Sequence, residues 1–125
     1  MASILFVDDI PAIHDLLTGL IATTEHSCET AVSGQSGLEL YRQKRFDAVV
    51  VDYSMEPMNG LEFMRAVLSL DSSAIVIIMS GYIDDRTAEK IMAAGAFAIV
   101  EKPFDLKQLL QVIESALNAP RDLGC

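Results

Sequence analysis

Short apolar segments recur along the chain, and each is followed by a longer amphipathic segment. Four of them, residues 4–7, 48–51, 74–79 and 96–100, are rich in Val and Ile. They are apolar at consecutive positions rather than at alternate ones, which is typical of parallel strands buried on both faces. Residues 28–32 form a weaker, mixed segment, which predicts an edge strand.

The amphipathic segment after the first strand predicts a helix that begins near Pro11. Proline suits the first helical turn because its fixed φ matches a helix. The apolar residues that follow have helical spacing: Ile13, Leu16, Leu17 and Leu20. This face leaves His14 on the solvent side of the helix.

Four further helices are predicted from similar patterns. They cover residues 36–44, residues 59–70, a segment capped by Asp84 or Asp85 that runs to about residue 94, and a segment capped by Asp105 that runs to Leu117. Gly95 suits the end of the fourth helix, because glycine readily adopts the positive φ found after a helical C-terminus.

The alternation of strands and helices predicts one α/β domain. Five of each within 125 residues fit a flavodoxin-like, doubly wound (βα)5 sandwich with a parallel five-stranded sheet in the order 2-1-3-4-5. We assign residues 1–120 to this domain and residues 121–125 to a C-terminal tail or the start of a truncated linker. Ligands of such folds bind beyond the carboxyl ends of the strands, between strands 1 and 3.

Composition excludes several classes of protein. The apolar content of 51% is too high for a disordered chain, and no apolar run exceeds six residues, so no membrane span is expected. Cys28 and Cys125 are too few for a disulfide framework or a metal site, and the first residues lack the basic region of a secretory signal, so a cytoplasmic location is expected. A net charge of −9 disfavours direct binding of nucleic acid.

Polar side chains follow four of the predicted strands. Asp8 and Asp9 follow the first strand, Asp52 the third, Ser80 the fourth, and Glu101 and Lys102 the fifth. Each has a simpler explanation when taken alone, as a helix cap, a loop acid, a turn residue or a solvated loop. The carboxyl ends of parallel strands share one edge of the sheet, however, so four such coincidences favour a single site.

The expected site needs a cation. Two like charges about 4 Å apart repel by roughly 4 kcal/mol at an effective dielectric constant near 20, and Lys102 supplies only one positive charge against three carboxylates. Mg²⁺ (or Mn²⁺) suits such oxygen ligands and keeps positions open for a phosphate oxygen. Asp52 would then be a nucleophile that forms an aspartyl phosphate.

These residues at these spacings resemble the receiver domain of response regulators of bacterial two-component signalling, as in chemotaxis regulators. The resemblance covers residues 3–117. It includes Met55 and Gly60, three and eight residues past Asp52, where the family has a recurrent Met and Gly. The match of the acidic pair, Asp52, Ser80 and the lysine–proline pair at residues 102–103 makes the resemblance specific.

The resemblance implies roles for the site residues. Asp9, Asp52 and the backbone carbonyl of Ser54 would bind Mg²⁺ directly, and Asp8 would act through a metal-bound water. Asp52 would accept the phosphoryl group. Lys102 would pair with the acyl phosphate. The Lys102–Pro103 peptide resembles one that is cis in the family, which would direct the ammonium group into the site. Ser80 would hydrogen-bond a phosphoryl oxygen and move toward it on activation.

The resemblance also implies partners. A sensor histidine kinase or a histidine phosphotransfer protein of a phosphorelay would supply the phosphoryl group, and residues 84–117 would be the switched surface that contacts an output protein or domain. A phosphorylation-dependent homodimer is a further option. The domain would catalyse its own phosphorylation and dephosphorylation, but it would be a signalling switch rather than an enzyme.

Some positions depart from the family pattern. Ile99 holds the place of the switch aromatic, three residues before the lysine, and cannot swing inward as Tyr or Phe does. Tyr82 and Phe97 are the candidates to replace it, although we favour the simpler interpretation of Phe97 as a core residue and Tyr82 as a loop residue. Glu56 stands where many members have Pro, which predicts a different loop path. A bulky Tyr82 predicts slow to moderate loss of phosphate.

Other classes fit less well. A flavodoxin needs a hydroxyl-rich loop where Asp8 and Asp9 would repel phosphate, and a dinucleotide-binding enzyme needs a G-x-G-x-x-G motif there, which this chain lacks. A haloacid-dehalogenase-like phosphatase needs a second Asp where Ser54 stands. The remaining alternative is a degenerate receiver that acts as an unphosphorylated protein-binding module, an option that Ile99 leaves open.

Overall fold

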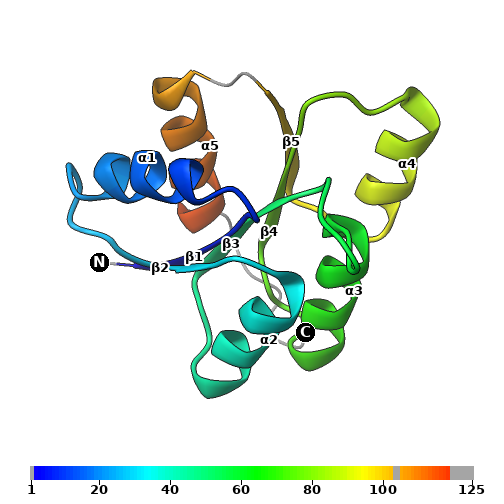
Figure 1. The fold of residues 1–125 in the computed structure, drawn as a ribbon, viewed down its shortest axis with the longest axis horizontal. Helices are drawn as coiled ribbons and strands as arrows, with labels where there is room; N and C mark the ends of the chain where they lie inside the picture. Colours follow the sequence, from blue (N-terminus) through cyan, green and yellow to red (C-terminus); the bar gives the residue numbers. More distant parts are fainter. Residues whose placement is uncertain (1, 103–104, 119–125) are drawn as a thin grey trace.

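The computed structural model describes residues 2–102 and 105–118, and its fold is the predicted one. One parallel sheet has the strand order β2-β1-β3-β4-β5 (Figure 1). The strands are β1 (Ser3–Val7), β2 (Ser27–Ala31), β3 (Ala48–Asp52), β4 (Val76–Ser80) and β5 (Ala98–Glu101). The helices are α1 (Pro11–Ile21), α2 (Gly34–Gln43), α3 (Gly60–Leu70), α4 (Asp85–Ala93) and α5 (Leu106–Asn118).

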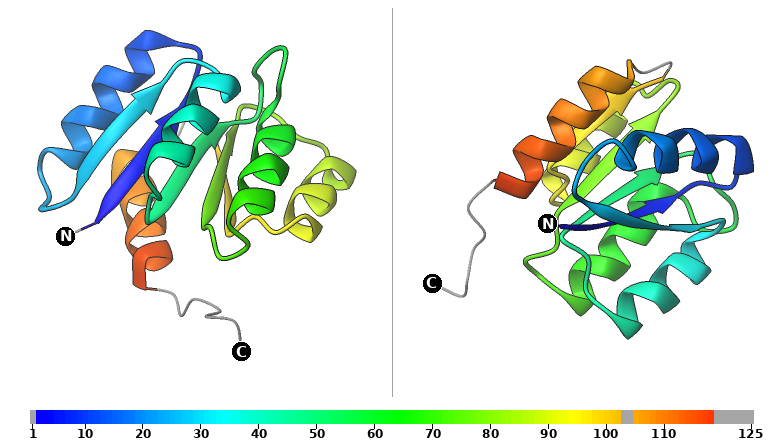
Figure 2. Two further views of the ribbon diagram at one scale, coloured as in Figure 1. Left: turned by 90° about the horizontal axis from the view of Figure 1, so that it is seen from below. Right: turned by 90° about the vertical axis from the view of Figure 1, so that its left-hand side faces the viewer.

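Helices cover both faces of the sheet (Figure 2). α1 and α5 pack on one face, where Leu17 and Ile113 join the inward side chains of the central strands. α2, α3 and α4 cover the other face, where Leu38, Phe63 and Ile91 contribute to a second apolar cluster. The central strand β3 is buried at all five positions, whereas the edge strand β2 is only partly buried, as its mixed sequence predicts. None of the helices described is long and apolar enough to cross a bilayer.

The register of the sheet brings the carboxyl ends of the strands together. Val7 of β1 pairs with Val51 of β3, so the residues that follow each of them are adjacent. Ser80, the last residue of β4, pairs with Glu101, the last residue of β5. One edge of the sheet therefore carries the polar residues that follow β1, β3, β4 and β5.

Two strands begin later than the apolar runs predict. β4 begins at Val76 rather than at residue 74, because the Ala74 N–H closes a turn onto the Asp71 carbonyl (3.0 Å). β5 begins at Ala98 rather than at residue 96, because residues 94–96 form the turn that follows α4. Gly95 has a φ of 118°, and the Ala96 N–H donates to the Ile91 carbonyl (3.3 Å).

α1 lies in a different rotation from the predicted one. Its buried stripe is His14, Leu17 and Ile21, while Leu16 is 44% exposed. The prediction that His14 faces solvent is therefore wrong. Both stripes have helical spacing, and a hydrogen bond described below holds the imidazole inside.

Side-chain caps define the starts of four helices, including α5, where the predicted cap Asp105 accepts from the Lys107 N–H (2.9 Å). Ser33 and Ser36 form a capping box at α2, so that this helix begins two residues before the predicted start. Asn59 Oδ1 accepts from the Glu62 N–H at α3, and Glu62 Oε1 accepts from the Asn59 N–H. Asp84 accepts from the Thr87 N–H (2.7 Å) at α4, which confirms its predicted capping role.

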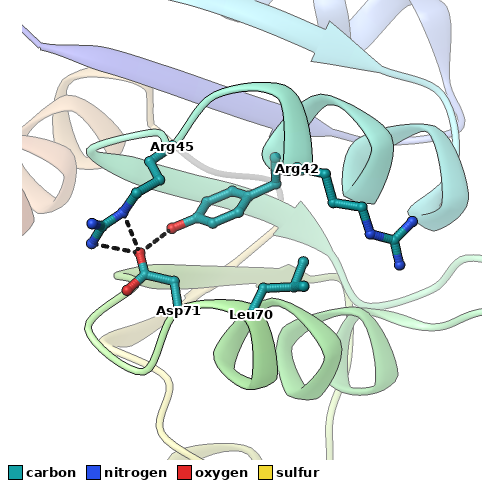
Figure 3. A pocket seen from close by; sticks show the side chains of 5 residues that line it. Arg42, Arg45, Leu70 and Asp71 are labelled. Carbon is teal, nitrogen blue, oxygen red and sulfur yellow. Dashed lines mark hydrogen bonds and ion pairs between the residues drawn. The ribbon is translucent and has the colours of Figure 1, made fainter.

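The opposite, amino edge of the sheet holds a polar tie between α2 and the segment after α3 (Figure 3). Tyr41 donates its hydroxyl to Asp71 Oδ2 (2.7 Å), and Arg45 pairs with the same oxygen (2.9 Å). A cavity of about 280 Å³ lies beside these side chains and is also lined by Arg42 and Leu70. Each guanidinium group already pairs with a carboxylate, Arg45 with Asp71 and Arg42 with Glu39.

Candidate functional site

Three carboxylates meet at the carboxyl edge of the sheet. Asp8 and Asp9 follow β1, and Asp52 ends β3. Each offers a carboxylate oxygen, and these oxygens all lie within 4.8 Å of one another. Asp8 and Asp52 are buried, whereas Asp9 is exposed. The three acidic residues predicted from sequence are therefore brought together, with one of them open to solvent.

Asp8 is fixed by the backbone around it. Its N–H donates to the Ala31 carbonyl of β2 (3.1 Å), and its Oδ1 accepts from the Ile10 N–H (2.9 Å). Burial raises the pKa of Asp8, against the opposing effects of the Ile10 N–H and the Lys102 ammonium; the negative charge of Asp52 adds to the rise. An ionised Asp8 is thus less favourable here than in water, as expected for a buried carboxylate whose negative charge is only partly compensated.

Lys102 reaches into this cluster from the end of β5. Its Nζ lies 3.3 Å from Asp52 Oδ1 and 3.4 Å from Asp8 Oδ2. Its backbone N–H donates to the Ser80 carbonyl (2.7 Å), which continues the pairing of β4 with β5 to the site. One ammonium group thus contacts both buried carboxylates. The Lys102–Pro103 bond, predicted to be cis, lies outside the described residues.

Ser80 ends β4 at the same edge and is buried. Within residues 2–102 and 105–118, its Oγ is a buried oxygen without a hydrogen-bond partner. Buried hydroxyl groups are normally paired, and exceptions often mark functional positions. The structure thus places a free hydroxyl donor at the edge of the sheet where the acidic residues meet.

The loop after Asp52 approaches the strand closely. The Gly60 N–H donates to the Tyr53 carbonyl (3.0 Å), and a Cβ on Gly60 would lie only 2.8 Å from the Asp52 carbonyl oxygen. The recurrent Gly at this position therefore has a physical reason in this chain. The Ser54 N–H points toward Asp52 Oδ1 (3.4 Å), and the Glu56–Pro57 peptide is cis.

The residues considered for the switch lie in different places. Ile99 pairs with Ile78 in the sheet and packs against the apolar cluster under α2 and α3. Tyr82 is 86% exposed on the loop after β4, in agreement with a loop residue. Phe97 is 37% exposed and precedes β5, so its interpretation as a core residue is wrong. Because the apolar run begins before the strand does, Phe97 lies toward the amino edge, at the opposite end of β5 from Lys102.

The site also includes a residue that the sequence interpretation missed. His14 Nε2 lies 2.6 Å from the Asp8 backbone carbonyl oxygen. The available signal was the second helical stripe, because His14, Leu17 and Ile21 are spaced as regularly as the apolar stripe that was chosen.

The donor set fits a hard divalent cation. Carboxylate oxygens are the ligands preferred by Mg²⁺ and Mn²⁺. An exposed carboxylate beside two buried ones allows access from solvent, and a single ammonium leaves the three carboxylates with net negative charge. The arrangement can therefore hold a cation and, beside it, a phosphate-like group.

Comparison with known proteins agrees with this arrangement. The chain matches the response regulator receiver domain over residues 4–114. It is 33% identical over 118 residues to the DNA-binding transcriptional regulator NtrC of Azospirillum brasilense, covering 94% of this chain and 24% of that protein. It is 32% identical over 115 residues to the regulatory protein AtoC of Escherichia coli K12, covering 92% and 25%. The chain thus spans about a quarter of the length of these curated relatives.

Solved structures agree as well. A response regulator receiver domain protein from Clostridium thermocellum superposes with a TM-score of 0.89 at 28% identity, over 94% of this chain and 95% of that chain. The chemotaxis protein CheY4 of Vibrio cholerae superposes with a TM-score of 0.88 at 26% identity, over 93% and 98%. With its sequence match, its strand order and its acidic edge in agreement, this chain belongs to the response regulator receiver domain family.

Proposed function

We propose that this receiver domain uses Asp52 as its phosphoacceptor, in a transfer from a phosphohistidine that requires Mg²⁺ (or Mn²⁺). The observation that supports this most is the convergence at one sheet edge: three carboxylates within 4.8 Å, with the Lys102 ammonium 3.3 Å from Asp52. The unpartnered hydroxyl of Ser80 adds a donor at the same edge.

Asp9, Asp52 and the backbone carbonyl of Ser54 would hold the cation directly, and Asp8 through a water. When bound, the cation neutralises the carboxylates and the oxygens of the phosphoryl group. Asp8 is well suited to an outer position, because its Oδ1 already accepts from the Ile10 N–H and its Oδ2 faces Lys102.

The chain's own residues account for the transfer. An Oδ atom of Asp52 attacks phosphorus, a P–O bond forms as the P–N bond of the donor breaks, and the released imidazole nitrogen takes a proton from solvent. Lys102 holds positive charge beside the attacking carboxylate, where negative charge gathers on the phosphoryl oxygens. The Ser80 hydroxyl donates to one of those oxygens.

The proposal includes partners. A sensor histidine kinase or a histidine phosphotransfer protein supplies the phosphoryl group. The output surface is residues 84–117, which contain α4, β5 and nearly all of α5. Relatives such as NtrC and ZraR are named as transcriptional regulators and are about four times as long as the matched segment, which supports an attached output domain. We also propose that phosphorylation allows a homodimer to form through this surface. In this proposal the domain is a signalling switch rather than an enzyme.

The test is the intact mass of the protein after incubation with a small phosphodonor, with and without Mg²⁺. We expect a single Mg²⁺-dependent phosphoryl adduct that is lost in Asp52→Asn. Asp85→Asn, which removes an exposed carboxylate from α4, is the matched control and retains the adduct. A protein that takes no phosphoryl group from a phosphodonor or a kinase, and that binds neither Mg²⁺ nor a phosphoryl mimic, would instead be the unphosphorylated binding module.

A further inference from the structure

α1 buries an imidazole and exposes a leucine. His14 lies in the buried stripe with Leu17 and Ile21, while Leu16 is among the exposed large apolar residues. The observed rotation buries Leu17 and Ile21 fully and places the His14 imidazole beside them, away from water. A buried imidazole needs a hydrogen-bond partner, because an unpaired buried polar group is costly.

The partner of His14 lies at the end of β1. His14 Nε2 lies 2.6 Å from the Asp8 carbonyl oxygen, and the bond is buried. A carbonyl oxygen only accepts, so Nε2 carries the proton and donates it. The bond joins the end of the first turn of α1 to the first acidic residue of the site.

With this bond, each polar group of Asp8 has a partner. The N–H donates to Ala31 of β2, Oδ1 accepts from the Ile10 N–H, and Oδ2 faces the Lys102 ammonium. His14 occupies the remaining position, the backbone carbonyl. Asp8 is thus held in one orientation by four separate contacts.

The bond also determines where Asp9 lies. The peptide group between Asp8 and Asp9 is planar, so a donor that fixes the Asp8 carbonyl also fixes the Asp9 N–H and its Cα. Asp9 is the exposed member of the acidic cluster, and Lys102 pairs with the other two carboxylates. Its placement within 4.8 Å of them therefore depends on its backbone.

We propose that His14 is a positioning residue of the acidic site: its Nε2–H holds the peptide between Asp8 and Asp9 so that the exposed Asp9 carboxylate is preset for a divalent cation. The inference rests on the proposed function, because it assumes that the site takes such a cation. Removal of the outer hydrogen bonds that orient metal ligands typically lowers metal affinity by about 10- to 100-fold.

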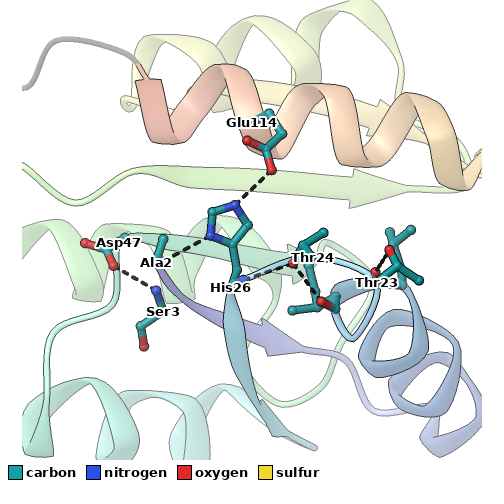
Figure 4. A network of polar contacts seen from close by, with 9 residues as sticks. Ala2, Ser3, Thr23, Thr24, His26, Asp47 and Glu114 are labelled. Atoms are coloured by element: carbon teal, nitrogen blue, oxygen red, sulfur yellow. Dashed lines mark hydrogen bonds and ion pairs between the residues drawn. The ribbon is translucent and has the colours of Figure 1, made fainter.

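Two substitutions separate this role from simple packing. His14→Leu keeps most of the buried volume and removes the donor. His14→Gln keeps an N–H donor with a similar reach. The matched control is His26→Leu at the amino edge of the sheet, where the second histidine of the chain accepts from the Ala2 N–H (3.0 Å) and contacts Glu114 of α5 (2.9 Å) (Figure 4). The control loses two histidine hydrogen bonds without altering the acidic site.

The measurement is the Kd for Mg²⁺ by titration calorimetry, with the melting temperature of each variant recorded in parallel. We expect His14→Leu to raise the Kd about tenfold, and His14→Gln to stay within about threefold of the wild type. His26→Leu should melt at a lower temperature with an unchanged Kd. The proposal is overturned if His14→Leu binds Mg²⁺ within about twofold of the wild type, or if His14→Gln binds no better than His14→Leu.

A spectroscopic measurement on the wild-type protein covers the case in which a variant does not fold. Two-bond ¹H–¹⁵N correlation spectra of the histidine rings should show the His14 proton on Nε2. A neutral ring with its proton on Nδ1 would overturn the proposal without any substitution. If the wild type binds no Mg²⁺, the proposed function fails as well. If the wild type binds Mg²⁺ and His14→Leu binds it with the same Kd, only the role of His14 is contradicted.

Discussion

At the ends of β1 and β3, two carboxylates are buried side by side. Burial raises the pKa of Asp8, so the ionised form that a cation requires is less favourable in the folded protein than in the unfolded chain. Lys102 contacts both carboxylates and offsets part of their repulsion. The clustering of carboxylates therefore lowers local stability, a common property of functional sites.

Gly60 shows how the loop after Asp52 depends on one missing Cβ. In Gly60→Ala the new Cβ would lie 2.8 Å from both the Asp52 carbonyl oxygen and Tyr53 Cα, and backbone atoms cannot move aside cheaply. We expect a loss of about 1–3 kcal/mol in the free energy of unfolding, measured by denaturant titration. Gly19→Ala is the control, because no atom lies within 4 Å of its added Cβ on α1. It should gain about 0.5–1 kcal/mol, and equal effects of the two substitutions would contradict this explanation.

Among the elements, the strands were the most predictable. A strand buried on both faces is apolar at consecutive positions, and the sequence of β3 shows this directly. The acidic site was predictable for the same reason, because parallel strands bring Asp8, Asp52 and Ser80 to one edge. The roles assigned to these residues in binding and transfer stay predictions.

The rotation of α1 was not predictable from periodicity. Two stripes, one with Leu16 and one with His14, fit a helix equally well. The observed one buries Ile21 and forms a hydrogen bond from His14 to a backbone carbonyl, which no side-chain pattern reveals. Phe97 was misplaced for a related reason. Apolar character continues across the turn at Gly95, so the pattern does not mark where β5 begins.

The tie between α2 and the segment after α3 should give a pH-dependent contribution to stability. Burial alone would raise the pKa of Asp71, but the hydrogen bonds from Tyr41 and Ser73, together with Arg45, hold it below its ordinary value. The stability that ionised Asp71 contributes is therefore present above its ordinary pKa and is lost as pH falls through the lower pKa of the folded state. Burial also raises the pKa of Tyr41, so its hydroxyl remains a donor at neutral pH.

We expect Asp71→Asn to lower the free energy of unfolding by about 1.5–3 kcal/mol at pH 7, the range for hydrogen bonds to a charged group. The difference from the wild type should shrink when both proteins are unfolded at about pH 3, below the ordinary pKa of an aspartate. Denaturant titrations at the two pH values provide the measurement, with the exposed Asp85→Asn as control. A difference of the same size at both pH values would show that Asp71 acts through packing alone.

For the whole molecule, the excess of acidic residues makes cations stabilising in two ways. The net charge of −9 is screened by any salt, whereas the proposed function requires the acidic site to bind a divalent cation specifically. We expect MgCl₂ at about 100 times its Kd to raise the free energy of unfolding by about 2.7 kcal/mol beyond NaCl of equal ionic strength. Thermal unfolding in the two salts measures this excess, which should vanish in Asp52→Asn. Equal stabilisation by the two salts would mean that screening explains the whole effect.

The chain order of the site residues has a consequence for synthesis. Asp52, the later of the two buried carboxylates, leaves the ribosome about 50 residues before Lys102, an interval of roughly 3 to 10 s at ordinary rates of translation. A nascent chain that paired β1 with β3 during this interval would bury two carboxylates without the ammonium that contacts both. The missing ammonium disfavours that pairing, so we expect β1 and β3 to pair stably only after β5 has been made. The receiver domain is therefore expected to close as one cooperative unit, late in its own translation.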